Sequence, residues 1–456
     1  MLGGFSLIIT SYMPAIALVT MKSSKPEKLL GVSEAAKILN VSGDTVRRWH
    51  KKGLINALNA ENGDRLFRLN DLKKLVEQQN STSSNWKVLK APKTKISTIE
   101  LFCGSGGLAL GLENAGLISK LAVDIDKDCV STLKLNRPNW DARCMSVTDL
   151  DLAEYEGKID VMAGGFPCQA FSYAGMKRGF EDARGTLFYE YARLIDQVKP
   201  RIVLGENVRG LTNHDSGKTL AVMVRILKNL GYEVEYKVLR SQFFDVPQKR
   251  ERLIIFGVDK SIASSVLYPV EKQYTVNLRT ALSDVPSSPG MAYSQAKSKV
   301  LKLVPAGGYW RDLPPSIQKD FMGASFHMGG GKTGMARRLS WDEPSLTLTC
   351  SPAQKQTERC HPDETRPLTV REYARIQCFP DDWQFSGSVT SQYKQIGNAV
   401  PVNLGYHIGL TIRKMLGRSL QGAEGVTDFI DQSKSQIEID FALNQSNQRV
   451  IRPTRK

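Results

Sequence analysis

The chain has 456 residues, enough for two or three domains with full cores, so one compact domain is not expected. Lysine and arginine total 62 against 46 aspartates and glutamates, and this surplus of 16 positive charges favours DNA or RNA as the partner. The seven cysteines are odd in number and lack CxxC pairs or a histidine cluster, which argues against a disulfide framework and predicts no zinc or other metal site.

Residues 1–21 form an apolar leader that runs from Phe5 to Met21 as FSLIITSYMPAIALVTM. The leader lacks a charged n-region, contains Pro14 and is too short for a membrane span. We expect a mis-assigned start, with translation beginning near Met13 or Met21, and an atypical signal peptide is the alternative. The rest of the chain is typical of a cytoplasmic protein with no membrane partner.

Residues 22–80 are predicted to fold as short helices with a polar hairpin. Ser33 is a candidate N-cap for a first helix, and a second helix from about Asp44 would bury Val46 and Trp49. Because Asn62-Gly63 indicates a turn, the segment resembles a winged helix-turn-helix of the MerR or excisionase kind. The alternative is a helical bundle used for protein contacts. The candidate DNA contacts are Arg47, Arg48, Lys51 and Arg65.

Residues 81–95 are polar and basic and are predicted to be a flexible linker. From Ile96 onward, apolar strands alternate with glycine turns and helices, which predicts an α/β fold with a mostly parallel, Rossmann-like sheet. We expect one domain over 96–265, a region rich in Ser, Pro and Gly over 266–365 where the alternation fails, regular structure again over 366–415, and a polar tail over 416–456.

The segment FCGSGG, residues 102–107, follows the first apolar strand and opens a helix. Its glycines would let a ligand approach the backbone donors at the helix N-terminus. Gly104, Gly106 and Ala109 also fit a dinucleotide-binding pattern, with Asp124 at the distance of a ribose-binding acid. The loop alone therefore leaves NAD open as the cofactor.

Three further strand ends carry reactive side chains. Cys168 lies in GGFPCQAFS after an apolar strand, Glu206 ends a second strand, and Arg250 and Arg252 open a third. A thiol, an acid and cationic groups at strand ends suit nucleophilic attack on an electron-poor ring, which a hydride-transfer enzyme would not require. Taken singly, Cys168 could be an inert buried thiol, and Glu206 or Arg252 a member of a structural ion pair.

The motifs together resemble the DNA (cytosine-5) methyltransferases from about Ile96 to Gly409. They are FCGSGGLALGL at 102–112, Asp124, GGFPCQAFS at 164–172, Glu206 to Val208, Gln248 to Arg252, RPLTVREYARIQCFP at 366–380 and QIGNAVPVNLG at 395–405. The resemblance implies an S-adenosylmethionine-dependent methyltransferase fold, with a catalytic domain over 96–265 and a variable target-recognition region at 266–365. It also implies that the C-terminal motifs over 366–415 complete the catalytic domain.

The resemblance also implies site residues. S-adenosylmethionine would be the cofactor, with Asp124 on the ribose and Ile125 against the adenine; Asp149 is the alternative to Ser146 for the adenine amino group. The cofactor-binding residues it implies are Phe102, Gly104, Ser105, Gly106, Gly107, Asp124, Ile125, Ser146, Pro167 and Asn398.

The implied reaction is methylation of C5 of a cytosine flipped out of duplex DNA. Cys168 would add to C6, Glu206 would hydrogen-bond N3, Arg252 would stabilise charge at O2 with Arg250 beside it, and Arg178 would meet a phosphate. The function expected is sequence-specific modification of double-stranded DNA in a restriction-modification system, with a separate restriction endonuclease as a candidate partner. The alternatives are a tRNA cytosine-5 methyltransferase, whose Cys-Phe-Thr signature is missing, and a DNA-binding regulator that uses the fold as a sensor.

Overall fold

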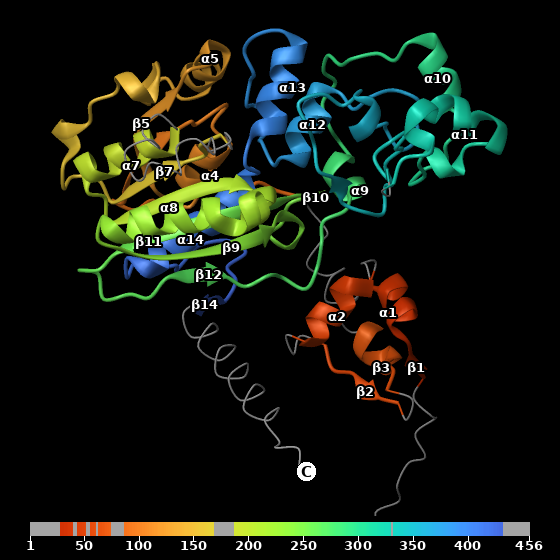
Figure 1. The fold of residues 1–456 in the computed structure, drawn as a ribbon, viewed down its shortest axis with the longest axis horizontal. Helices are drawn as coiled ribbons and strands as arrows, with labels where there is room; N and C mark the ends of the chain where they lie inside the picture. The colour runs from red at the N-terminus through yellow and green to blue at the C-terminus, as the bar shows by residue number, and fades with distance from the viewer. Residues whose placement is uncertain are drawn as a thin grey trace, which may run out of the picture. The chain divides into compact units, whose positions relative to one another are not determined.

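The computed structural model describes residues 28–39, 43–51, 55–60, 63–73, 86–167, 187–329 and 332–431. The chain divides into two compact units, Met1–Glu77 and Gln78–Lys456, shown in Figure 1. Several predictions fall wholly or partly outside the described residues: Cys168, Arg178, the leader over 1–21, residues 81–85 of the linker and residues 432–456 of the tail. The side chain of Arg48 is not described either.

The smaller unit contains the predicted helix-turn-helix. Helices α1 (Val32–Ile38) and α2 (Gly43–Lys51) pack with an antiparallel sheet of order β1-β3-β2, formed by β1 (Leu29–Leu30), β2 (Leu58–Asn59) and β3 (Arg65–Arg68). Val46 and Trp49 are fully buried, as predicted. The cap of α1 is Gly31 and not Ser33, because the Glu34 carboxylate accepts a hydrogen bond from the Gly31 backbone N–H at 3.1 Å.

The larger unit is built on a mixed sheet of seven strands, counted over the described residues, with the order β6-β5-β4-β7-β8-β11-β9. All neighbouring pairs from β6 to β8 are parallel, whereas β11 runs antiparallel to both β8 and β9. The start of β11 therefore lies beside the carboxyl end of β8. In chain order the strands are β4 (Ser97–Leu101), β5 (Ile118–Asp124), β6 (Ala142–Cys144), β7 (Val161–Gly164), β8 (Ile202–Val208), β9 (Tyr232–Arg240) and β11 (Glu251–Asp259).

Helices cover both faces of this sheet, as the predicted Rossmann-like fold requires. Side chains alternate between two cores: Met162 and Val203 pack with α7 (Leu187–Val198) and α8 (Lys218–Asn229), whereas Ala163 and Leu204 face the core on the opposite side. That second core also holds α4 (Gly107–Asn114), α5 (Lys127–Asn136) and α14 (Val402–Met415). The sheet is thus the middle of three layers.

Helices α4 and α14 touch through glycines. A Cβ on Gly111 would lie 2.5 Å from the carbonyl oxygen of Val402, and one on Gly409 would lie 2.4 Å from the Cβ of Ala115. The two backbones therefore approach more closely than side chains at these positions would allow. This contact joins the beginning of the larger unit to its C-terminal helix.

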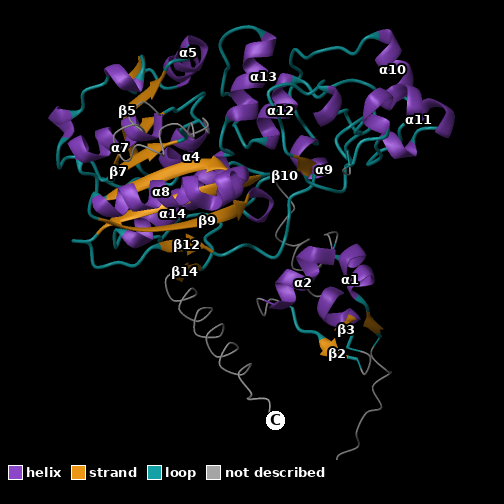
Figure 2. Cartoon of the chain, viewed as in Figure 1, coloured by secondary structure: helices purple, strands orange, loops and turns teal. Residues whose placement is uncertain are grey.

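A second lobe of the larger unit follows β11 and coincides in part with the predicted target-recognition region. Figure 2 shows α10 (Gln295–Leu301), α11 (Pro315–Met322), α12 (Val370–Ile376) and α13 (Val389–Asn398) gathered to one side of the sheet. A small core around Leu301, Trp310 and Met322 holds α10 and α11. The remaining elements are α9 (Leu278–Leu282), the parallel pair β10 (Gln248–Lys249) and β13 (Ser345–Leu346), the antiparallel pair β12 (Leu267–Pro269) and β14 (Phe429–Asp431), and 3₁₀ turns at Val147–Asp149, Ala153–Tyr155, Arg209–Gly217, Ser241–Phe243, Trp310–Asp312, Gly323–Phe326 and Lys355–Thr357.

Residues 86–95 differ from the flexible linker expected over 81–95. Leu89 is buried and its backbone N–H donates to Asn403 on α14, while Glu424 binds both the Lys87 ammonium and the Lys90 backbone N–H. The first part of the expected tail, 416–431, is likewise packed, because Glu424 and β14 both lie in it. Apolar Leu89 anchors a segment whose composition otherwise indicates a linker.

Candidate functional site

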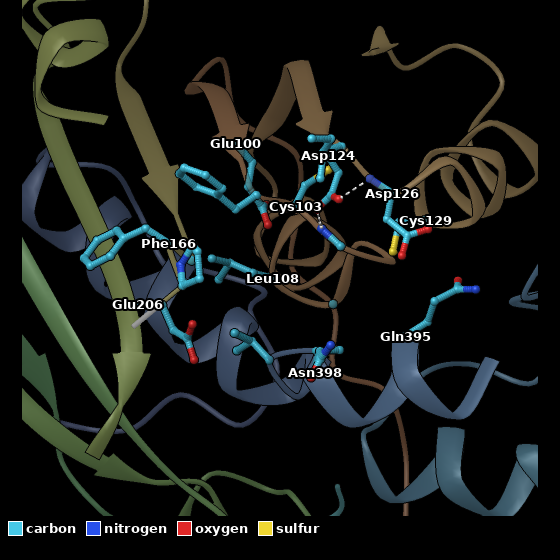
Figure 3. A pocket seen from close by; sticks show the side chains of 18 of the residues that line it. Glu100, Cys103, Leu108, Asp124, Asp126, Cys129, Phe166, Glu206, Gln395 and Asn398 are labelled. Atoms are coloured by element: carbon cyan, nitrogen blue, oxygen red, sulfur yellow. Dashed lines mark hydrogen bonds between the residues drawn. The ribbon is translucent and has the colours of Figure 1, made fainter. Parts of the chain in front are cut away.

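A cavity of about 600 Å³ opens at the carboxyl ends of β4, β5, β7 and β8. Figure 3 shows Glu206 and Phe166 at one end of it, Asp126 and Cys129 at the other, and Gln395 and Asn398 reaching it from α13. Parallel strands of open α/β sheets commonly present ligand-binding residues at this edge. The predicted site residues that line the cavity are Phe102, Gly104, Gly107, Asp124, Ile125, Ser146, Pro167, Glu206, Arg252 and Asn398, while Asp149 is not among the lining residues.

The loop between β4 and α4 is held open by unusual backbone angles. Phe102 and Gly104 have φ of 56° and 53°, in the left-handed region. The Gly104 N–H donates to one oxygen of Asp124 at 2.8 Å, and the Asp126 N–H donates to the other at 2.8 Å. Because a carboxylate oxygen accepts more than one hydrogen bond, Asp124 can still receive a ligand hydroxyl from the cavity.

Burial raises the pKa of Asp124, and the backbone N–H groups of Asp126 and Gly104 oppose this rise. Beside Asp124, the side chain of Ile125 is 74% exposed although it is apolar, and it lines the cavity. An apolar side chain beside a carboxylate that can accept hydroxyls suits a nucleoside, whose ring is flat and whose ribose donates hydrogen bonds.

Ser105 and Gly106 were expected to bind the cofactor, but neither lines the cavity. Ser105 is buried and its hydroxyl donates to the carbonyl of Gln395 at 3.3 Å, so it fastens the loop to α13. Gly106 is the cap residue of α4 with φ of 85°, and a Cβ there would lie 2.4 Å from the side chain of Leu133. Both residues therefore support the loop without lining the cavity.

Glu206 and Arg252 form an ion pair at the opposite end of the cavity. The Nε of Arg252 lies 2.8 Å from Oε1 of Glu206, and each side chain is only 12% exposed. Burial raises the pKa of Glu206, and the guanidinium groups of Arg252 and Arg250 oppose the rise. Glu206 is therefore able to hold a proton at higher pH than an ordinary glutamate. Gly165 leaves room for it, since a Cβ there would lie 3.2 Å from Oε2.

Arg250 was expected to act beside Arg252, but it does not line this cavity. Its guanidinium is fully buried and donates to the carbonyl oxygens of Leu348, Gly397 and Asn398 at 3.0–3.3 Å. Arg250 thus fixes the C-terminal end of α13, which carries Asn398. It lies between β10 and β11, where its guanidinium is enclosed by the carbonyls of α13 and of the segment after β13.

Pro167 lines the cavity, and Cys168 follows it in the sequence. Residues 165–167, which follow β7, are tied to β8 by Asn207, whose buried side-chain amide donates to the Phe166 carbonyl at 2.9 Å. Asn207 therefore positions the residues before the candidate nucleophile relative to Glu206. We assigned Asn207 no role from sequence, although its place directly after Glu206 is a usable signal.

Glu100 is a further residue that we did not single out from the sequence. It lies on β4, lines the cavity and is 4% exposed, and its Oε2 has no hydrogen-bond partner among the described residues. Burial raises its pKa, and the carboxylates of Glu206 and Asp124 raise it further. A buried carboxyl aimed at a cavity favours a cationic or hydrogen-bonding ligand.

The far end of the cavity carries a salt bridge. Lys394 on α13 lies 2.9 Å from Asp126, which also caps α5 by accepting the N–H of Asp128. At the near end of α13, the Asn398 amide oxygen lies 3.1 Å from the thiol sulfur of Cys350. Lys394 and Asp126 are 268 positions apart in the sequence, and the fold brings them together at one end of the cavity.

The candidate DNA contacts of the smaller unit are at its surface. Arg47 and Lys51 on α2 and Arg65 on β3 are exposed, and Val46 and Trp49 on the buried side of α2 fix which face of the helix points outward.

Comparisons with known proteins agree with this arrangement. Residues 96–414 match the family model of the C-5 cytosine-specific DNA methylases, and residues 29–80 match a helix-turn-helix domain. The type II methyltransferase M.Eco47II of Escherichia coli is 53% identical and covers 85% of this chain and 96% of its own length. M.PspPI of Psychrobacter sp. (strain TA137) is 48% identical over 86% of this chain and 97% of its own length, and M.Sau96I of Staphylococcus aureus is 54% identical over 69% and 75%.

Solved structures share the fold. A candidate DNA modification methyltransferase encoded within an E. coli prophage superposes with a TM-score of 0.53 at 23% identity, covering 71% of this chain and all of that one. Within the described residues, none of the helices is both long and apolar enough to cross a membrane.

Proposed function

This chain belongs to the C-5 cytosine-specific DNA methylase family, and we infer that it transfers a methyl group from S-adenosylmethionine to C5 of cytosine in duplex DNA as the modification enzyme of a type II restriction-modification system. The observation that carries this proposal is the buried Glu206–Arg252 pair, which lies in the same cavity as Pro167, the residue before Cys168.

The donor set around the other end of the cavity fits S-adenosylmethionine. Asp124 retains free acceptor positions for the ribose hydroxyls, and exposed Ile125 offers an apolar surface for the adenine. Glu100 suits the positive charge of the cofactor, because it lines the cavity and its Oε2 has no hydrogen-bond partner within the described part of the chain. When bound there, the cofactor supplies an electrophilic methyl group on a sulfonium.

The protein side of the reaction is activation of the cytosine ring. The Cys168 thiolate adds to C6, a sulfur–carbon bond forms, and the electrons of the C5–C6 double bond become available at C5. Glu206 holds a proton against N3, and Arg252 stabilises the negative charge that develops at O2. After C5 has taken the methyl group, loss of the C5 proton restores the double bond and expels the Cys168 thiolate.

Duplex DNA as the substrate implies base flipping, since a stacked cytosine cannot reach a buried acid. The lobe around α10 and α11 is proposed to recognise the target sequence. The helix-turn-helix, with Arg47, Arg48, Lys51 and Arg65, is proposed to add DNA affinity or to bind the upstream DNA of its own gene. Arg178 is proposed as a phosphate contact beside Cys168.

The test is incubation of the purified protein with unmethylated plasmid and S-adenosylmethionine, followed by bisulfite sequencing. Methylation at one short motif, abolished by Cys168→Ala and retained by Cys144→Ala, is the expected result; Cys144 is an exposed thiol at the same sheet edge that does not line the cavity. If calorimetry shows that the protein binds the cofactor and the DNA still contains no 5-methylcytosine, the proposal is contradicted.

A further inference from the structure

A second cavity, of about 350 Å³, lies at the same edge of the sheet. Its walls come from the end of β8, the end of β9 and the start of β11. Among the described residues that line it, five are cationic and one is acidic: Arg209, Arg240, Lys249, Arg250 and Arg252, with Glu251. A concave surface lined by one sign of charge attracts anions, because its walls hold the field within the cavity.

The two cavities share a wall. Val208 and Arg252 line both of them, and Arg252 is the residue that pairs with Glu206 in the first. A ligand whose ring lies against Glu206 can therefore reach past Arg252 and place an anionic group in the second cavity. A nucleotide has this layout, since its base and its phosphate are separated by a sugar.

The cations are held in ways that leave them available to an anion. Arg209 pairs with Glu251 at 2.7 Å and Lys249 with Glu343 at 2.6 Å, but these pairs are partly exposed, with Arg209 at 64% and Lys249 at 37%. Exposed pairs of this kind contribute little to stability, so a phosphate can replace either carboxylate at low cost. Glu343, which neutralises Lys249, does not line the cavity.

The deeper cations are held in place by groups outside this cavity. Arg240 pairs with Glu271, which is buried and does not line the cavity, and buried Arg250 is bound by backbone carbonyls. Among the described residues, Arg250 forms no direct ion pair, and Glu206 in the first cavity is the acid that acts on its charge. Gln242 adds a neutral amide donor to the same wall.

We propose that this second cavity binds a backbone phosphate of the target strand next to the flipped cytosine, with Arg209 and Lys249 as its exchangeable cations. The inference rests on the proposed function. It assigns a binding role to two residues that lie outside the catalytic cavity and take no part in the chemistry at the ring.

The test compares Arg209→Ala, Lys249→Ala and the double variant of the full-length protein with Arg201→Ala. Arg201 is a matched control: it precedes β8 just as Arg209 follows it, it is 44% exposed, and it pairs with Asp160 at the opposite edge of the sheet. Binding to a duplex containing the methylated motif is measured over a range of salt concentrations. Loss of this one phosphate contact in the double variant is expected to lower the slope of log K against log salt by about one, and each single variant by less, whereas Arg201→Ala leaves it unchanged.

A second arm locates the phosphate. Single methylphosphonate linkages, which lack the charge, are placed on either side of the target cytosine. One of them is expected to weaken binding by the wild-type protein about tenfold and to have no further effect on the double variant. Equal weakening of both proteins at every linkage, or unchanged salt slopes in the double variant, would overturn the inference.

A free anion is the competing occupant. Calorimetric binding of inorganic phosphate that disappears in the double variant, together with no effect of any methylphosphonate, would assign the cavity to free phosphate and overturn the DNA contact. Failure of the proposed function is distinguishable, because it would appear as a wild-type protein that methylates no plasmid DNA.

Discussion

Three carboxyl groups, those of Glu100, Asp124 and Glu206, line one cavity, and burial raises the pKa of each. Among the described residues, only Glu206 of these three has a guanidinium within ion-pairing distance. Such a cluster stores unfavourable electrostatic energy that a cationic ligand can relieve.

The cluster predicts a pH-dependent cost in stability. Glu100 keeps its proton in the folded state at pH values at which the same carboxyl is ionised in the unfolded chain. The folded protein therefore binds more protons than the unfolded chain, and its free energy of unfolding falls as pH rises above about 4.5. Glu100→Gln removes the ionisable group and is expected to raise the melting temperature at pH 8 relative to the parent, with the gap closing towards pH 5. Thermal denaturation of both proteins without cofactor measures this, and a constant gap would contradict it.

Arg252 carries a second prediction at this scale. Arg252→Lys keeps the charge but loses the planar fork that meets both Glu206 and the expected base oxygen. The methylation rate is expected to fall about 100-fold, with unchanged affinity for S-adenosylmethionine, because the cofactor end of the cavity is untouched. Single-turnover transfer of a tritiated methyl group and calorimetry separate the two effects. A loss of affinity for S-adenosylmethionine would contradict the assignment of Arg252 to the cytosine.

The sequence was sufficient to predict which strand ends meet, but not which neighbouring residue faces the ligand. Arg250 and Arg252 are two positions apart, yet Arg250 is buried against backbone carbonyls whereas Arg252 lines the first cavity. Likewise, glycines 104 and 106 both have positive φ, yet one lines the cavity and the other caps α4. These distinctions depend on backbone angles that residue type does not determine.

At the scale of elements, the crossing of α4 and α14 determines how the two ends of the larger unit meet. The sequence predicted that the glycines of 104–107 serve a ligand, whereas Gly111 and Gly409 were not singled out because their role appears only when two helices are known to cross. The buried segment 86–95 was missed for a similar reason, since a single apolar Leu89 does not stand out in a polar stretch.

Gly111→Ala tests this crossing. A methyl group there would meet the Val402 carbonyl and the Gly405 backbone, so we expect destabilisation of about 1–3 kcal/mol from overpacking, offset slightly by the better helix propensity of alanine. Gly329→Ala is the control, because a Cβ there meets nothing within 4 Å. Urea denaturation measures both variants. Equal stability of the two would show that the helices can separate without penalty.

At the scale of the whole molecule, the chain consists of two units whose boundary at residues 77 and 78 precedes the packed segment. This position predicts a difference between two truncations. Removal of residues 1–85 keeps Trp86, which stacks on Arg375 at 5.1 Å, and the Lys87–Glu424 pair; removal of residues 1–95 deletes both.

The shorter truncation is expected to retain the methylation rate on saturating plasmid and to lose DNA affinity at high salt, because the helix-turn-helix is absent. The longer truncation is expected to melt at lower temperature, since buried Leu89 and its hydrogen bond to Asn403 are lost. Identical melting curves for the two truncated proteins would contradict the assignment of 86–95 to the larger unit.

The glycine contact between α4 and α14 also affects when the cavity is completed during synthesis of the chain. The ribosome adds about 5–20 residues per second, so roughly 300 residues and about 15–60 seconds separate synthesis of the Gly104 loop from synthesis of α13 and α14. Until then one wall of the cavity is missing, and the core that α4 and α5 share with α14 is incomplete. A nascent chain cannot methylate DNA during that interval, and in a cell newly supplied with the gene, protection of the genome begins only when whole chains are released.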